Sequence, residues 1–332
     1  MIKIDVIKNQ RFDSVHKYLF ELLSKDKYDI KYIDQSYNKL LTLLRDDTDI
    51  IWTRSPYIKL PEYSKPFVLT ICGLFWWEVK NPVLLNTANK SCQKASRIIL
   101  LGNYGYNEFL SYMPNAKDKT IVIPNGIHIK DAISVNKVVS VTGETIEFDN
   151  DILITFVSNF MFEGKLQAAK ELIELFIKKL SLSRVKFVIA GKARSNNPFN
   201  IPANLRHKII YIGYYNNILG LLKRTNIFVY HTYQDIQPNA VLEASAMGIP
   251  VVVTNNCGLN QWIRDGITGF VCRNLDELAQ KVKLLINRES LRLEMGKEAK
   301  KFVQRNFSWQ KCAGEYDKVF TELYKKTKTH KN

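Results

Sequence analysis

Two carboxylates eight residues apart stand in a stretch whose pattern suits binding of a phosphorylated ligand. Asp235 follows the apolar run 227–230 in a polar loop, and Glu243 lies in a predicted helix that begins after Pro238 and ends at Gly248. A helix start exposes N–H groups that suit a diphosphate, and carboxylates accept hydrogen bonds from sugar and ribose hydroxyls. The competing interpretation is a helix whose acids only complement its dipole.

The elements around these acids alternate between strands and helices. Apolar runs of strand type at 227–230 and 251–254 flank the helix, and the same alternation extends over 151–274 before three helices from Leu275 onward. Such alternation predicts βαβ units and a parallel sheet. Because ligands collect outside the carboxyl ends of such strands, the loop that carries Asp235 is placed where a ligand would bind.

The stretch resembles the signature of retaining GT-B glycosyltransferases of family four (glycosyl transferases group 1). It consists of Asp235, seven residues, Glu243, small residues, Gly248, one residue, Pro250 and a β-branched strand. Asp235 replaces the Glu that the family usually has. The resemblance implies that Asp235 is catalytic and orients the donor sugar, and that Glu243 binds the ribose.

The resemblance also implies donor-binding roles for residues around this signature. The helix start would bind the sugar or its phosphates through Pro238, Asn239 and Ala240, and His231 would hydrogen-bond the donor. Lys165 matches a phosphate-binding lysine, although a single lysine at a helix start is usually a solvated surface residue.

Further positions match the family less closely. Asn159 stands where the family has a phosphate-binding arginine, and Lys170 replaces Lys165 if the register differs. Gly213 and Tyr214 follow a strand that borders the nucleotide base in the family, with loop packing as the alternative role of the tyrosine. The pair Gly191–Lys192 matches a nucleotide-binding loop.

The first half of the chain resembles the family at fewer positions. Cys72–Gly73 stands at a strand end where the family has His-Gly, and we expect it to line the cleft and not to be a nucleophile. Asn125–Gly126 belongs to a turn that closes the first domain at the cleft in the family. The Gly-rich loop that many members carry after their first strand is replaced by Lys8–Arg11.

The 332-residue chain carries a formal charge of +16, and residues 151–332 contribute +13 of it. Such a basic half implies an anionic partner, namely a nucleotide, an anionic membrane surface or nucleic acid, and the alternative is a lysine-rich composition that serves only solubility. The last is disfavoured because no aromatic-basic recognition motif accompanies the charge. The longest apolar run, 67–77, is too short for a bilayer span, and residues 1–10 read as a strand. We therefore expect a cytoplasmic protein with peripheral membrane contact left open.

The resemblance implies an α/β protein of the GT-B fold, with two Rossmann-like, doubly wound domains facing across a cleft. We expect an acceptor-side domain over 1–130 with the returning helix 308–326, an irregular linker over 131–150, and a nucleotide-sugar-binding domain over 151–307.

The function implied is transfer of a sugar from a nucleotide sugar to an acceptor hydroxyl, with retention of configuration and without a metal or other cofactor. The acceptor classes considered are a glycan, a lipid-linked molecule and a small molecule. Two alternatives stay open: a non-catalytic GT-B homologue that acts as a scaffold, favoured by Asn159 and the altered first loop, and a nucleotide-sugar epimerase.

Overall fold

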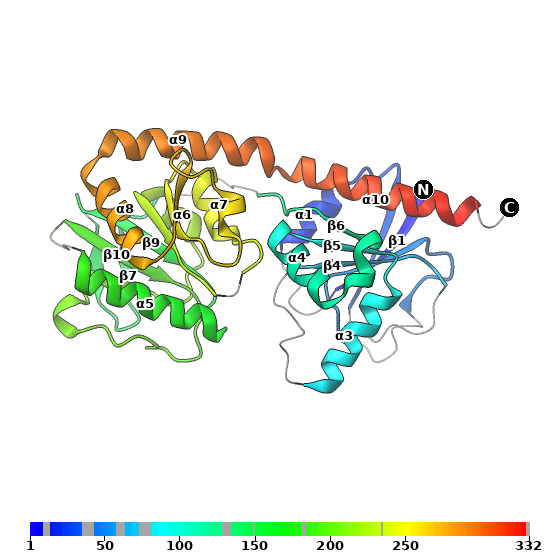
Figure 1. Ribbon diagram of the computed structural model, residues 1–332, viewed down its shortest axis with the longest axis horizontal. Coiled ribbons are helices and arrows are strands. Elements are labelled where there is room, and N and C mark those ends of the chain that lie inside the picture. The colour runs from blue at the N-terminus through cyan, green and yellow to red at the C-terminus, as the bar shows by residue number, and fades with distance from the viewer. Residues whose placement is uncertain are drawn as a thin grey trace. The chain divides into compact units, whose positions relative to one another are not determined.

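The computed structural model describes residues 1–8, 14–34, 43–57, 64–72, 81–127, 134–148, 150–180, 184–233 and 235–329. The chain divides into two compact units (Figure 1). Unit 1 comprises Met1–Gly126 and Phe307–Asn332, and unit 2 comprises Ile127–Asn306.

Unit 1 contains a six-stranded parallel sheet in the order β2-β1-β3-β4-β5-β6. Its strands are β1 (Ile2–Lys8), β2 (Tyr28–Asp34), β3 (Ile50–Thr53), β4 (Phe67–Ile71), β5 (Arg97–Leu100) and β6 (Thr120–Val122). Successive residues of a strand face opposite sides of the sheet. In β3, Ile50 and Trp52 therefore join one core cluster while Ile51 joins another.

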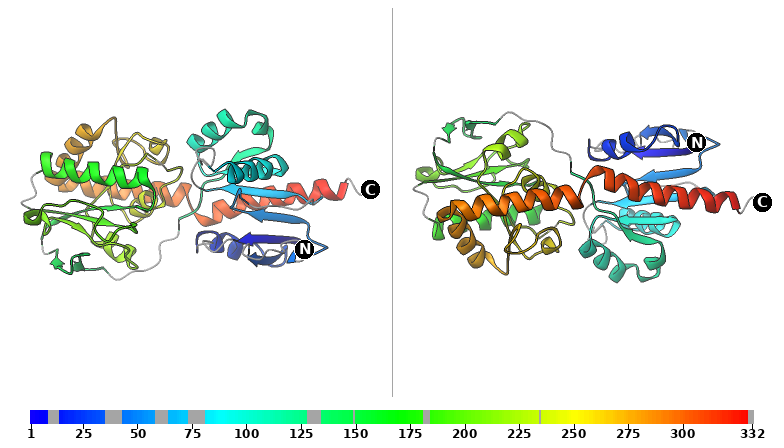
Figure 2. Two further views of the ribbon diagram at one scale, coloured as in Figure 1. Left: turned by 90° about the horizontal axis from the view of Figure 1, so that it is seen from below. Right: turned by 90° about the horizontal axis from the view of Figure 1, so that it is seen from above.

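Helices cover both faces of this sheet. They are α1 (Ser14–Leu22), α3 (Pro82–Lys94), α4 (Asn103–Tyr112), a 3-10 turn (Pro114–Lys119) and α10 (Trp309–Thr329). Phe20 of α1 and Phe320 of α10 pack in the cluster of Trp52, and Cys92 of α3 and Phe109 of α4 pack in the other. Figure 2 shows α10 running along one face of the sheet. Coverage of both faces confirms the prediction of a doubly wound domain.

Unit 2 repeats this architecture with a six-stranded parallel sheet in the order β11-β10-β9-β12-β13-β14. Its strands are β9 (Ile152–Val157), β10 (Val185–Ala190), β11 (Ile209–Tyr211), β12 (Ile227–Tyr230), β13 (Val251–Thr254) and β14 (Gly269–Cys272). Its helices are α5 (Glu163–Lys179), α6 (Ile218–Arg224), α7 (Asn239–Ala246), α8 (Leu275–Asn287) and α9 (Glu289–Asn306), with 3-10 turns at Ala203–Leu205 and Leu259–Trp262.

The stretch 131–150 differs from the irregular linker that we predicted. Within it, β7 (Lys137–Val139) and β8 (Thr145–Glu147) form an antiparallel hairpin. Val138 and Ile146 point from the hairpin into a core cluster of unit 2 that includes Val188 of β10. The prediction failed because each strand contributes one buried side chain between exposed neighbours, and three residues are too few for the alternation to be recognised.

None of the helices that the structure describes has the length and apolar composition that a bilayer span requires.

Candidate functional site

The predicted donor residues Lys165 and Asp235 meet at the carboxyl edge of the unit 2 sheet. Lys165 lies in the first turn of α5, and Asp235 lies in the loop between β12 and α7. Lys165 Nζ donates to Asp235 Oδ2 at 2.6 Å, and the two side chains are only 15% and 12% exposed. A partly buried pair of this kind holds both groups in a defined position. The sequence prediction thus brings together two residues that are seventy positions apart.

Tyr230, the last residue of β12, is a third member of this group and was missed by the sequence analysis. Its hydroxyl donates to the same oxygen, Asp235 Oδ2, at 2.7 Å. Burial and the charge of Asp235 raise the pKa of Tyr230 well above its usual value, so the phenol remains a proton donor. The available signal was a tyrosine at the end of a buried strand, because a buried hydroxyl needs a partner.

Helix α7 presents unpartnered polar groups at its start. Pro238 is its N-cap residue, and neither Asn239 nor Ala240 donates its N–H to any described residue. The side-chain oxygen of Asn239 is buried and also lacks a partner within the described ranges. These groups match the two requirements of a bound sugar diphosphate, which needs donors for its phosphates and acceptors for its hydroxyls.

Glu243 lies one turn into α7 and is half-buried. Burial raises the pKa of its carboxyl group. Among the residues that the structure describes, none donates a hydrogen bond or forms an ion pair to this carboxylate. An acidic side chain kept in such surroundings has free acceptor capacity for a ligand hydroxyl.

The predicted nucleotide-binding glycines lie together at the ends of β10 and β11. The Gly191 N–H donates to the Gly213 carbonyl at 2.7 Å. A Cβ atom at Gly191 would stand 1.8 Å from the carbonyl oxygen of Ser158, so only glycine permits this close approach of β10 to the end of β9. Next to them, Lys192 is exposed and Tyr214 is 73% exposed, which leaves its ring available to stack on a base.

Two other predicted residues form hydrogen bonds that stabilise the loops at this edge of the sheet. Asn159 is exposed, and its side-chain oxygen accepts the Met161 N–H at 3.2 Å in the turn before α5. His231 is buried, with Nδ1 hydrogen-bonded to Thr254 Oγ1 at 2.7 Å and Nε2 to Glu171 Oε2 at 2.9 Å. Because both of its ring nitrogens are engaged, His231 holds the loop between β12 and α7 against α5 and β13, and its direct contact with the donor stays a prediction.

The first-domain positions lie at the carboxyl edge of the unit 1 sheet, except Gly73, which is outside the described residues. Cys72 follows β4, and its sulfur accepts a hydrogen bond from Arg54 Nε at 3.1 Å. Asn125 is buried, and a Cβ atom on Gly126 would stand 2.4 Å from Trp309 Cα. Gly126 therefore permits close packing of α10. Arg54 was not predicted, although a cation directly after a buried strand is a recognisable signal.

In the described ranges, the His, Cys, Asp and Glu side chains form no group of three or more that could hold a metal ion. Independence from a metal stays a prediction.

Known proteins resemble this chain in sequence and in fold. The family described as glycosyl transferases group 1 matches residues 143–302, which include Lys165, Asp235 and Glu243. The capsular polysaccharide biosynthesis glycosyltransferase CapM of Staphylococcus aureus is 28% identical over 166 residues, which are 47% of this chain and 43% of CapM. The chain therefore spans less than half of that relative's length.

Solved glycosyltransferase structures cover nearly the whole chain. Sucrose-phosphate synthase of Thermosynechococcus elongatus superimposes with a TM-score of 0.73 at 14% identity, covering 98% of this chain and 99% of that one. Anabaena HepE in complex with UDP-glucose gives 0.69 at 12% identity, covering 97% and 100%. These likenesses confirm the predicted GT-B fold. Residues 143–302 match the glycosyl transferases group 1 family, as the resemblance in the signature implied.

Proposed function

We propose that this chain transfers a sugar from a nucleoside-diphosphate sugar, bound by unit 2, to an acceptor hydroxyl. The observation that carries the proposal is the meeting of Lys165 and Asp235 at the edge where α7 begins. One site then offers a cation for the diphosphate and a carboxylate for the sugar. The complex of HepE with UDP-glucose supports a nucleotide sugar as the class of donor.

Each side chain then has a role that follows from its surroundings. Asp235 Oδ2 is shared by Lys165 and Tyr230, and its other oxygen is available for a sugar hydroxyl. Glu243 accepts hydrogen bonds from the ribose, and the exposed ring of Tyr214 stacks on the base.

In the reaction, the bond between the anomeric carbon and the phosphate oxygen breaks and a bond to the acceptor oxygen forms. The proton of the acceptor hydroxyl passes to the leaving phosphate, so the step needs no enzymatic nucleophile and retains the configuration. Lys165 and the N–H groups of Asn239 and Ala240 stabilise the negative charge that develops on the diphosphate. These groups replace a metal ion in the proposed reaction.

Calorimetric titration of UDP, GDP and ADP into the wild type and Glu243→Gln tests the donor site. Glu163→Gln is the matched control, because Glu163 is an exposed acid in the same unit. We expect one nucleotide to bind the wild type and the control, and to bind Glu243→Gln about tenfold more weakly, since hydrogen bonds to a charged group contribute about 1.5–3 kcal/mol.

Binding of none of the nucleotides by a folded wild type would contradict the proposal. Release of the sugar from the matching nucleotide sugar, measured on the same samples, separates a transferase from a scaffold that binds nucleotide without turnover.

A further inference from the structure

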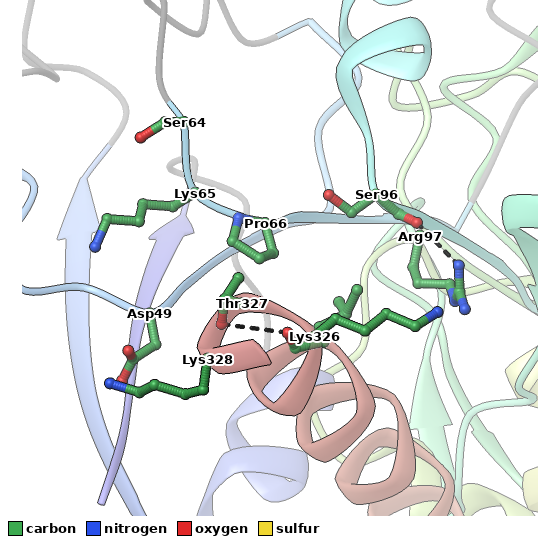
Figure 3. Close-up of a pocket in the computed structure, with 10 residues that line it drawn as sticks. Asp49, Ser64, Lys65, Pro66, Ser96, Arg97, Lys326, Thr327 and Lys328 are labelled. Atoms are coloured by element: carbon green, nitrogen blue, oxygen red, sulfur yellow. Dashed lines mark hydrogen bonds between the residues drawn. The ribbon is translucent and has the colours of Figure 1, made fainter. Parts of the chain in front are cut away.

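A pocket of about 610 Å³ lies in unit 1, at the edge of the sheet opposite to Cys72 and Asn125. Three of its lining residues directly precede parallel strands: Asp49 before β3, Pro66 before β4 and Ser96 before β5. The last turn of α10 forms the other wall (Figure 3). The pocket thus belongs to the amino edge of the sheet, and its volume is that of a small-molecule site.

Among the residues that the structure describes, four cations and one carboxylate line this pocket. The cations are Lys65, Arg97, Lys326 and Lys328, and the carboxylate is Asp49. Figure 3 shows Lys326 extending toward the side of Arg97, while Lys65, Asp49 and Lys328 lie on the other side.

The neighbouring Glu322 neutralises only part of this charge. It binds Arg97 Nη2 at 2.5 Å and Lys326 Nζ at 2.7 Å, which fixes both heads beside the pocket. Within the described part of the chain, Lys65 and Lys328 form no ion pair, and the Lys328 ammonium lies 5.2 Å from the centre of the Tyr324 ring. The lining therefore keeps a net positive charge that suits an anion.

The carboxyl end of α10 would by itself repel an anion, because its last carbonyl groups carry partial negative charge. Two threonine hydroxyls reduce this effect. Thr327 Oγ1 donates to the Tyr324 carbonyl at 2.7 Å, and Thr329 Oγ1 donates to the Lys326 carbonyl at 3.0 Å.

The rest of the lining suits an organic group attached to the anion. Asp49 Oδ2 accepts the Lys3 N–H at 2.9 Å, so the other oxygen can accept a ligand hydroxyl. Pro66 and Leu323 add apolar surface. We propose that this pocket binds a phosphate ester of a polyol, with the phosphate held by the lysines and Arg97 and a hydroxyl held by Asp49. Such an ester occurs as a free metabolite or as the headgroup of an anionic lipid.

The test measures binding of glycerol 3-phosphate to the full chain by calorimetry. We expect Lys65→Gln/Lys328→Gln to weaken binding by about tenfold or more, because the double variant removes two charged hydrogen bonds to the phosphate and each of them contributes to the free energy of binding. The control Lys90→Gln/Lys325→Gln removes the same charge from exposed residues of unit 1 that do not line the pocket. Ser64→Trp is expected to block the pocket without any change of charge.

Vesicles distinguish the two sources of the ligand. Sedimentation with phosphatidylcholine vesicles, with and without phosphatidylglycerol, shows whether the headgroup occupies the pocket. The ligand is a lipid headgroup if vesicle binding depends on phosphatidylglycerol, is reversed by glycerol 3-phosphate and is abolished by Ser64→Trp. The ligand is a free metabolite if the protein binds soluble glycerol 3-phosphate but not the vesicles.

The proposal is overturned if the wild type binds neither probe, if the control weakens binding as much as Lys65→Gln/Lys328→Gln, or if Ser64→Trp leaves binding intact. Circular dichroism during urea denaturation, measured on the same samples, shows whether unit 1 of each variant is folded, and nucleotide binding by unit 2 is expected to be unchanged because unit 2 does not line this pocket.

Discussion

At the scale of single residues, Asp235 receives hydrogen bonds from a lysine and a tyrosine on one oxygen. Its position is fixed from two elements, because Lys165 belongs to α5 and Tyr230 to β12. Removal of Lys165 would leave Asp235 with the tyrosine hydroxyl, so the carboxylate would lose its counter-charge but keep a hydrogen bond. Lys165 therefore has two roles, one toward Asp235 and one toward the phosphates of the donor.

We expect Lys165→Ala to weaken binding of the matching nucleoside diphosphate by roughly 10- to 100-fold, which corresponds to the loss of one or two charged hydrogen bonds. Lys170→Ala is the control, since Lys170 is exposed on the same helix and is the alternative candidate from the sequence. Calorimetric titration of both variants measures the effect. A loss in Lys170→Ala and not in Lys165→Ala would reverse the assignment.

The sequence allows prediction of those site residues that lie close to one another along the chain. Asp235 and Glu243 share one short stretch, so their spacing was visible. Tyr230 and Glu171 take part through contacts that the fold creates, and nothing in the local pattern links Glu171 to His231, which lies sixty positions later.

At the scale of elements, His231 connects β12 with α5 and β13. Its ring binds Glu171 on one side and Thr254 on the other, and Tyr233 donates to the same Glu171 oxygen at 2.8 Å. Burial lowers the pKa of His231, and the opposing effect of Glu171 is smaller. The ring is therefore neutral in the folded protein near neutral pH.

This lowered pKa predicts a pH-dependent stability. Between the usual histidine pKa of about 6.5 and the lower value in the fold, the unfolded chain binds a proton that the folded chain does not, so the free energy of unfolding falls as pH falls. Urea denaturation between about pH 7.5 and 5.5 should show this slope in the wild type and a flatter one in His231→Gln. His207→Gln changes an exposed histidine of the same unit and should keep the wild-type slope. Equal slopes in all three proteins would contradict the argument.

The β7–β8 hairpin offers a second test at this scale. Ile146 is 6% exposed in the unit 2 core, whereas Val139 on the same hairpin is 56% exposed. We expect Ile146→Ala to lower the free energy of unfolding by about 2–5 kcal/mol, and Val139→Ala to change it by less than about 0.5 kcal/mol. Urea denaturation measures both values. Similar small effects would mean that the hairpin is dispensable, as the predicted linker would be.

The positions of strands and helices could be predicted where the periodic pattern was long or where an apolar run formed a buried strand. The first of the helices predicted from Leu275 onward is α8, and the run predicted over 227–230 is β12. The hairpin was missed because its strands have three residues each, and its contribution depends on packing against a sheet whose position the local sequence does not reveal.

At the scale of the whole molecule, the chain leaves unit 1 at Gly126 and returns to it at Phe307. Helix α10 then supplies buried residues to the unit 1 core, among them Trp309, Tyr316 and Phe320. The Tyr316 hydroxyl lies 2.9 Å from Thr70 Oγ1 of β4. The resemblance to the family implied this return, while composition and periodicity indicated only a helix there.

This connectivity predicts unequal behaviour of the two halves when they are separated. A fragment of residues 127–306 keeps its whole sheet and its own core, so we expect it to unfold cooperatively and to bind the matching nucleoside diphosphate. A fragment of residues 1–126 loses α10 and exposes the face of β1 and β3 that this helix covers, so we expect it to lack a cooperative transition. Circular dichroism during urea denaturation and calorimetric titration measure these properties.

Restoration of a cooperative transition by joining residues 307–332 to the shorter fragment through a flexible linker would assign the defect to the missing helix. Cooperative unfolding of residues 1–126 alone would show instead that α10 is not required for the unit 1 core.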